Sequence, residues 1–260
     1  MGVGDDCAAL SLPGTTVITT DAMIEGVHFK SEWMPAFMLG QKAFEVNASD
    51  VAAMGGRPAF ALLSLGIPQE YEVAHLDTFF DGFLKASQAY GTGVIGGNMS
   101  SAPVLMISVS MLGDTPYGYV TRSGARTGDD IYVTGTLGDA SIGLQILNGE
   151  VGEGVAAADL ERLKLRFLCP TARVLVGLAL AADRVATAMI DISDGLLQDL
   201  THICEASKVG ASIEAKRLPV SSEYEAVMGR GEPVEALAGG ENYELLFCGA
   251  PENHAQIHFQ

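Results

Sequence analysis

The sequence lacks most of the features that identify a protein class directly. Its 260 residues hold one tryptophan, and 15 lysines and arginines stand against 32 aspartates and glutamates, for a formal net charge of −17. A surface this poor in positive charge repels nucleic acids and anionic lipids, so we expect neither a nucleic acid nor a membrane as partner. No apolar run approaches the roughly 18 residues of a membrane-spanning helix.

Several familiar motifs are also missing. The four cysteines show no C-x-x-C spacing, and no signal segment precedes them, which predicts reduced, buried thiols in a cytoplasmic protein. Neither a P-loop nor a nucleophile elbow occurs. Residues 91–96 match G-x-G-x-x-G, but that motif binds dinucleotides only between a preceding strand and a following helix. The pattern here is helix, glycines, strand, so we reject a dinucleotide site.

Hydrophobic periodicity predicts an α/β fold in both halves of the chain. Strands are expected at 15–29, 59–67, 92–97, 103–112, 131–135, 187–193, 211–218 and 243–249. Helices are expected at 35–54, around 76–84, at 139–148, 159–168 and 171–182, and from residue 196 onward. The continuous apolar run 59–67 is typical of a strand buried on both faces. A Gly- and Thr-rich stretch near residue 120 predicts a boundary between domains 1–120 and 121–260.

What the sequence does contain is a set of carboxylates beside small residues. These are Asp5, Asp6, Asp21, Asp50, Asp191 and Asp194. Each alone has a structural explanation: Asp194 as a helix N-cap, Asp5 in a turn, Asp50 on a solvated helix face beside Asn47. Together they favour an oxygen-only site for Mg²⁺ or Ca²⁺ over zinc. Since Mg²⁺ bridges carboxylates to substrate phosphates, we interpret the set as several Mg²⁺ ions carrying a nucleoside triphosphate.

Seven segments in order then resemble one enzyme family. They are GDDCA, TTDAMIEGVHF, NASDVAAMGGRP, GGNMS, TRSGARTGDDIYVTG, IDISDGLLQD and GGENYELLF. They are similar to thiamine-monophosphate kinases, within the aminoimidazole-ribonucleotide synthetase-like superfamily. The resemblance implies direct transfer of the γ-phosphoryl group of ATP to thiamine monophosphate, assisted by Mg²⁺. It also implies two α/β domains and a homodimer in which the N-terminal sheets of two copies close a barrel.

The resemblance further assigns roles by position, with no covalent nucleophile. The implied Mg²⁺ ligands are Asp6, Thr19, Thr20, Asp21, Asp50, Asn98, Asp191 and Asp194. The implied ATP contacts are Gly97, Asn98, Arg122 and Ser193. The implied contacts to thiamine monophosphate are His28 and Glu241. Phe80 and Tyr90 are both candidates for stacking on adenine.

The chain departs from the family pattern at three points. Asn98 and Asn242 stand where the family commonly has aspartate, which removes a charge at each position. The family also has a helix before the first motif and strands after the last, so we expect an incomplete second domain. Two alternatives stay open: a related ATP-using synthetase or maturation enzyme, and a truncated, non-catalytic nucleotide- or metal-binding module.

Overall fold

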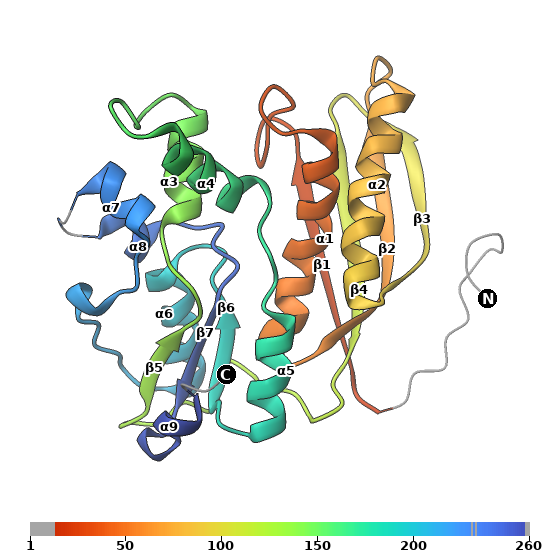
Figure 1. The fold of residues 1–260 in the computed structure, drawn as a ribbon. Helices are drawn as coiled ribbons and strands as arrows, with labels where there is room; N and C mark the ends of the chain where they lie inside the picture. The colour runs from red at the N-terminus through yellow and green to blue at the C-terminus, as the bar shows by residue number, and fades with distance from the viewer. Residues whose placement is uncertain (1–13, 230, 232, 258–260) are drawn as a thin grey trace.

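The computed structural model describes residues 14–229, 231 and 233–257, which form two sheets with their helices (Figure 1). The first sheet is built from β1 (Thr16–Ile24), β2 (Arg57–Ile67), β3 (Gly93–Ser101) and β4 (Met106–Asp114). Its strand order is β1-β4-β2-β3, with β4 antiparallel to both neighbours and β2 parallel to β3. Strands β1 and β3 are therefore the two edges.

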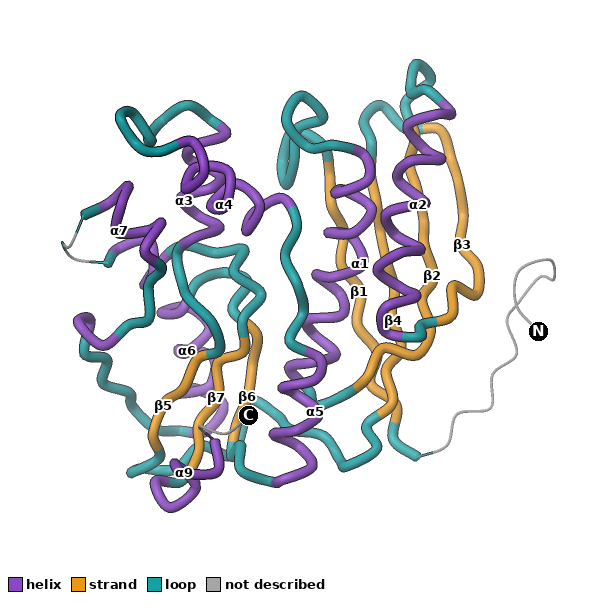
Figure 2. The backbone as a smooth tube through the Cα atoms, in the orientation of Figure 1, coloured by secondary structure: helices purple, strands orange, loops and turns teal. Residues whose placement is uncertain are grey.

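Two long helices cover one face of this sheet, α1 (Ala36–Ala53) and α2 (Val73–Tyr90) (Figure 2). They approach closely because each presents a glycine to the other. A Cβ atom on Gly40 would lie 2.0 Å from the carbonyl oxygen of Phe79, and one on Gly82 would lie 1.9 Å from that of Phe37. Only glycine leaves room for such backbone contact. The rings of Phe44 and Phe83 pack edge to face between the helices.

The other face of the first sheet is left open. Along β2, Ala61, Leu63 and Leu65 are buried beneath the helices, whereas Leu62 is 37% exposed. The expectation that 59–67 is buried on both faces is therefore wrong for the single chain. Side chains alternate between the faces of a strand, and only one face carries helices. Ile18 on β1 is 71% exposed, so the open face also presents apolar surface at an edge.

The second half forms a smaller antiparallel sheet in the order β5-β7-β6, from β5 (Asp130–Val133), β6 (Ala188–Asp191) and β7 (Leu245–Gly249). Its helices are α3 (Asp139–Leu147), α4 (Ala157–Leu168), α5 (Val174–Asp183), α6 (Leu196–Ser207), α7 (Ser222–Met228), α8 (Val234–Ala238) and α9 (His254–Ile257). The prediction of an α/β arrangement in both halves is confirmed. Among the described helices, none has the length and apolarity needed to cross a membrane.

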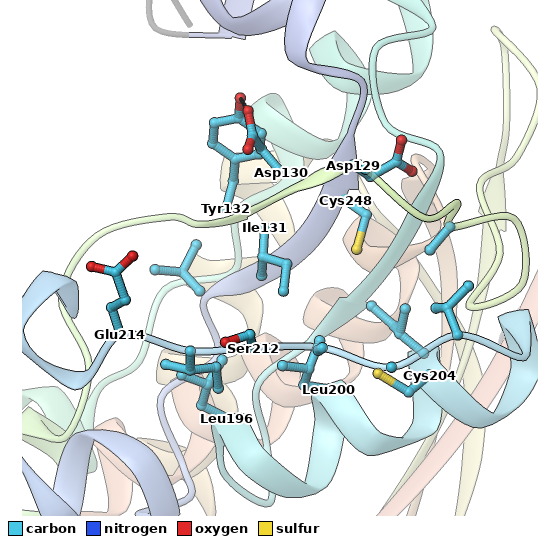
Figure 3. A pocket seen from close by; sticks show the side chains of 18 of the residues that line it. Asp129, Asp130, Ile131, Tyr132, Leu196, Leu200, Cys204, Ser212, Glu214 and Cys248 are labelled. Carbon is cyan, nitrogen blue, oxygen red and sulfur yellow. Dashed lines mark hydrogen bonds between the residues drawn. The ribbon is translucent and has the colours of Figure 1, made fainter.

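One predicted strand is wrong. Residues 211–218 run as irregular chain into a short 3₁₀ turn, Ala215–Arg217. A cavity of about 500 Å³ lies between this segment and β5, and Figure 3 shows Ile131 and Cys248 pointing across it toward Leu200 on α6. A strand needs a hydrogen-bonded neighbour, and the described residues provide none for this segment.

The two halves meet along α1. Gly177 of α5 lies so close to α1 that a Cβ atom there would be 2.2 Å from the carbonyl oxygen of Ala52. A single hydrophobic core contains Phe44 and Val51 of α1 together with Met189 of β6 and Phe247 of β7. Because this core is continuous across the junction, side chains of α1 are held at fixed positions against the ends of the second sheet.

Candidate active site

A pocket of about 220 Å³ opens where α1, the end of β1 and the second sheet meet. Its lining residues are Asp21, Ala22, Met23, His28, Lys42, Val46, Asp50, Asp191, Ser193, Asp194, Glu241 and Tyr243. Five of these twelve side chains are carboxylates contributed by four separate segments of the chain. We call this cavity the acidic pocket.

Strand β1 and helix α1 form one wall of the acidic pocket. The hydroxyl of Thr19 donates a hydrogen bond of 2.5 Å to Oδ2 of Asp50, and the backbone N–H of Asp21 donates to Oδ1 of Asn47 at 3.1 Å. Asn47 and Asp50 share a helix face because they are three residues apart. These two bonds hold the end of β1 against this face of α1.

The opposite wall carries Asp191, the last residue of β6. Its carboxylate is almost fully buried and accepts a hydrogen bond of 2.7 Å from the hydroxyl of Ser49 on α1. The pKa of Asp191 is raised to about 7, mainly by burial and in addition by the negative charge of Asp50. The Ser49 hydrogen bond opposes this shift without cancelling it.

The carboxylates of the wall formed by β1 and α1 are similarly disfavoured as anions. Burial raises the pKa of Asp50, opposed by the Thr19 hydrogen bond and the positive charge of Arg122. Burial also raises the pKa of Asp21, and the charges of Asp50 and Glu241 add to the shift. Like charges gathered in partial shelter from water raise one another's pKa, and a bound cation would relieve this repulsion.

Asp194 is not the N-cap of α6, so that structural explanation is wrong. Gly195 occupies the cap position, and the carboxylate of Asp199 accepts the backbone N–H groups of Asp194 and Gly195 at 3.2 and 3.1 Å. The side chain of Asp194 is exposed and accepts only one described hydrogen bond, from Gln198 at 2.9 Å. Since Asp199 satisfies the helix end, the carboxylate of Asp194 is left facing the pocket.

Glu241 reaches the pocket from a tight loop before β7. The backbone N–H of Glu241 donates to the carbonyl of Ser193 at 2.7 Å, and a Cβ atom on Gly240 would lie 2.5 Å from the same oxygen. Glu241 and Tyr243 both adopt left-handed backbone conformations, with φ of 64° and 52°. Non-glycine residues rarely adopt such values, and they concentrate at functional sites.

His28 reaches the pocket because the chain turns sharply after β1. The stretch 26–29, expected as a strand, is a turn in which the backbone N–H groups of Val27 and His28 bond to the carbonyl of Ile24. The Nδ1 atom of His28 accepts the backbone N–H of Ile24 at 3.1 Å. This bond orients the exposed ring toward the pocket and leaves Nε2 free to act as a donor.

Two polar residues of the acidic pocket, Lys42 and Tyr243, are not among the site residues predicted from the sequence. Lys42 is a buried lysine whose Nζ atom lies 2.6 Å from Oε2 of Glu241. Tyr243 is buried, and burial followed by the charges of the surrounding carboxylates raises its pKa well above the usual value. Lys42 lies eight residues, or about two turns, before Asp50 on α1, so helical periodicity from Asp50 through Val46 places it on the same face.

Asn242 serves the loop rather than the pocket. Its Oδ1 accepts the backbone N–H of Gly138 at 2.9 Å, and its Nδ2 donates to the carbonyl of Gly239 at 2.7 Å. An ionised aspartate has no donor for the second bond. The asparagine at this position therefore suits the turn that presents Glu241.

The structure does not bring all the predicted site residues together in one chain. Gly97 and Asn98 lie on edge strand β3, separated from β1 by two strands. The hydroxyl of Thr20 points to the neighbouring strand and donates to the carbonyl of Val109 at 3.0 Å. Asp6, like Asp5, lies outside the described residues.

Neither candidate for adenine stacking lines the acidic pocket. Phe80 packs edge to face on Phe79 along α2. Tyr90 stacks on Phe44, and its hydroxyl donates to Glu45 at 2.9 Å. Both rings belong to the helical layer of the first half, and stacking of either one on adenine stays a prediction.

The donor set of the acidic pocket fits a hard cation. Within residues 14–229, 231 and 233–257, no three His, Cys, Asp or Glu side chains converge as ligands of one ion. Mg²⁺ needs no such cage, since it keeps several waters and binds through one or two carboxylates plus substrate phosphates. Asp50 and Asp191, with raised pKa values and close enough to interact, are the pair best suited to it.

Comparison with known proteins agrees with the geometry. Residues 4–115 match the N-terminal domain of AIR synthase related proteins, and residues 126–258 match the C-terminal domain. A thiamine-monophosphate kinase from Escherichia coli strain K12 is 42% identical over 254 residues, which are 95% of this chain and 75% of that protein. The chain belongs to the thiamine-monophosphate kinase family.

Solved structures of this family share the fold. Thiamine-monophosphate kinase from Stenotrophomonas maltophilia K279a superposes with a TM-score of 0.91 at 40% identity, covering 100% of this chain and 83% of that one. AaThiL complexed with AMPPCP and TMP superposes with a TM-score of 0.84 at 40% identity, covering 91% and 76%. The expected two-part AIR-synthase-like fold is thus confirmed, and the family assignment made on seven short segments holds over the whole chain.

Proposed function

We propose that this chain catalyses the ATP-dependent phosphorylation of thiamine monophosphate to thiamine diphosphate. The observation that carries the proposal is the acidic pocket, which lies in a fold that matches a thiamine-monophosphate kinase over the entire chain. In the reaction, a phosphate oxygen of thiamine monophosphate forms a bond to the γ-phosphorus of ATP. The bond to the bridging oxygen breaks, and ADP leaves with that oxygen.

Such a transfer needs positioning and charge neutralisation rather than a nucleophile on the protein. Two polyanions must meet in line on a protein with a formal net charge of −17. Bound Mg²⁺ would neutralise phosphate oxygens and hold the two substrates in register. Asp21, Asp50, Asp191 and Asp194 would hold the metal, because their carboxylates line one pocket.

The remaining residues divide between the two substrates. Arg122, whose positive charge acts on Asp50, and Ser193, which lines the acidic pocket, would contact ATP. The free Nε2 of His28 suits a phosphate oxygen of thiamine monophosphate. The carboxylate of Glu241 suits the cationic and amine-bearing rings of the same substrate. Both lie in the acidic pocket, which supports a common substrate site.

We further propose that the active form is a homodimer. In one chain β1 and β3 are opposite edges of the first sheet, so Gly97 and Asn98 are remote from Thr20 and Asp21. If two such sheets closed a barrel, β3 of one copy would lie against β1 of the other. Gly97 and Asn98 would then approach the partner's pocket, which supports their role as ATP contacts and that of Asn98 as a neutral metal ligand.

The domain division and the location follow from the same proposal. Residues 1–120 would carry ATP, Mg²⁺ and the dimer contacts, and residues 121–260 would close the substrate side.

Cys169, Cys204 and Cys248 are free thiols; Cys248 is buried and the other two are half-buried. Free thiols and the use of ATP support a cytoplasmic location.

The test is product formation from ATP and thiamine monophosphate, followed by chromatography with and without Mg²⁺. Thiamine diphosphate and ADP in equal amounts, formed only with Mg²⁺, is the expected result. ATP consumption with thiamine monophosphate left intact would favour a related synthetase or maturation enzyme. Binding of ATP by calorimetry without any turnover would identify a non-catalytic module and overturn the proposal.

A further inference from the structure

Lys42 is a charged residue in a place where lysine is seldom found. It lies on α1 at the floor of the acidic pocket, and only 1% of its surface is exposed. A buried ammonium group is costly unless it is paired and hydrogen-bonded. Its presence therefore requires a specific set of partners, which the structure provides.

The Lys42 ammonium group lies against groups of Glu241 and Phe167. Nζ lies 2.6 Å from Oε2 of Glu241 and donates to the carbonyl of Phe167 at 2.8 Å. It also lies 3.6 Å from the centroid of the Phe167 ring, within the range of a cation–π contact. These contacts engage the ammonium group with Glu241 and Phe167 within the protein.

Glu241 depends on this lysine in turn. Apart from the ion pair with Lys42, its buried Oε2 accepts no hydrogen bond from the described residues. The residue also sits in a left-handed backbone conformation that its loop must maintain. Without the ammonium group, the carboxylate would have no cation to fix its position, and it would turn toward water or take up a proton.

The contact joins separate parts of the molecule. Lys42 belongs to α1 of the first half, Phe167 to α4, and Glu241 to the loop before β7. Burial lowers the pKa of Lys42, while the Glu241 carboxylate raises it and so favours the charged form. The ion pair therefore ties the position of Glu241 to the helix that also carries Asp50.

We propose that Lys42 is a positioning residue that holds the carboxylate of Glu241 toward the thiamine ring of the substrate. The inference rests on the proposed function and deepens it, because it assigns recognition of the cationic part of the substrate to a Lys42–Glu241 pair. Lys42 acts through Glu241 and does not touch ATP. Its loss should therefore weaken thiamine monophosphate binding and leave ATP binding nearly unchanged.

The experiment compares Lys42→Met, which keeps the length of the side chain but removes its charge, with Lys85→Met as matched control. Lys85 is an exposed lysine on α2, remote from the pocket lining. In Lys42→Met we expect KM for thiamine monophosphate to rise about tenfold or more and KM for ATP to change less than about twofold. Lys85→Met should match the wild type in both.

A double-mutant cycle with Glu241→Gln tests whether Lys42 acts through Glu241. The double variant should bind thiamine monophosphate no more weakly than Glu241→Gln alone, because residues that act through one contact are not additive. Effects that multiply, or equal increases in KM for both substrates in Lys42→Met, would overturn the inference. If Lys42→Met does not fold, Lys42→Gln, which still donates to the Phe167 carbonyl, takes its place.

Failure of this inference is distinguishable from failure of the proposed function. Wild-type protein that forms no thiamine diphosphate refutes the function. The pair is then tested by thermal unfolding of the same four proteins, in which non-additive melting temperatures support the Lys42–Glu241 coupling. Additive melting temperatures would show that the two side chains do not stabilise one another.

Discussion

The surroundings of Asp50 and Asp191 in the acidic pocket disfavour the ionised form of each carboxylate. Asp50 and Asp191 face each other across the junction of the two halves, and the pKa of each is raised by burial. The folded protein thus destabilises the negative charge of both side chains, because burial removes the water that solvates an exposed aspartate. Such an arrangement is typical of sites where charge serves binding rather than stability.

Asp50→Asn should separate the contribution of Asp50 to binding from its contribution to stability. The amide oxygen of asparagine can still accept the hydrogen bond from Thr19, so the melting temperature should equal or exceed that of the wild type. Activity should fall about 100-fold or more, the loss typical of removing one group that stabilises transition-state charge. Steady-state kinetics beside thermal melting measures both, with Asp77→Asn on the exposed side of α2 as control. Turnover near the wild-type rate would contradict a metal-binding role for Asp50.

Asp191→Asn should change how stability depends on pH in the presence of a chelator. The pKa of Asp191 in the folded protein, about 7, lies above its ordinary value of 3.8, so the folded state binds the proton more tightly. That contribution is complete below pH 3.8 and is lost as the pH rises through 7. The variant should therefore gain in melting temperature relative to the wild type between pH 5 and pH 8.

One result with Mg²⁺ would support the Asp191 prediction, and one result with pH would contradict it. Adding Mg²⁺ at pH 8 should stabilise the wild type more than Asp191→Asn, because a cation bound to the folded state raises its stability. A difference in melting temperature that is the same at pH 5 and pH 8 would mean that Asp191 does not titrate in this range.

At the scale of elements, the position of the pocket depends on how closely the helices pack. Helix α1 is held on one side against α2 through Gly40 and Gly82, and on the other against α5 through Gly177. Since α1 carries Lys42 and Asp50, a shift of this helix would move two pocket residues together. Glycine at these contacts thus serves the geometry of the site as well as the core.

Gly82→Ala should be strongly destabilising. The added Cβ atom would lie 1.9 Å from the carbonyl oxygen of Phe37, so the two helices must move apart. Overpacking of this kind typically costs about 1–3 kcal/mol and sometimes more, and each kcal/mol lowers the melting temperature by about 2–4 °C at this size. Gly210→Ala, where the new Cβ would meet nothing within 4 Å, is the control. Equal melting temperatures for the two variants would refute the close helix contact.

At the scale of the whole molecule, the open face of the first sheet and the split set of ATP residues point to a second copy. Ile18→Glu places a charge on the exposed edge strand β1. We expect this variant to be monomeric by light scattering and to lose ATP binding, since in the proposed dimer Gly97 and Asn98 would be supplied by the other copy. Leu175→Glu on α5, where the leucine is 80% exposed, should keep the dimer. A monomeric wild type that turns over normally would contradict the dimer proposal.

The sequence by itself determined the main elements, because helix and strand periodicities are local properties. The helix containing Asn47 and Asp50, the strand that carries Asp191 and the order of helix, glycines and strand around residues 91–96 follow from spacing, and they are confirmed. The family resemblance added residue roles that spacing alone did not supply. In the structure, the hydrogen bond from Ser49 of α1 to Asp191 brings the strand that carries Asp191 to the helix that carries Asp50.

Only the tertiary structure decided which of these residues meet. Lys42 forms its ion pair with Glu241, which lies almost 200 positions later in the chain, so no local pattern predicts the contact. Segment 211–218 has strand-like composition but no strand partner among the described residues. The Thr20 hydroxyl bonds to Val109, and Asn98 lies on the opposite edge strand from Asp21, although the resemblance grouped both with the carboxylates. Contacts between distant segments depend on strand order and helix packing, which local periodicity does not encode.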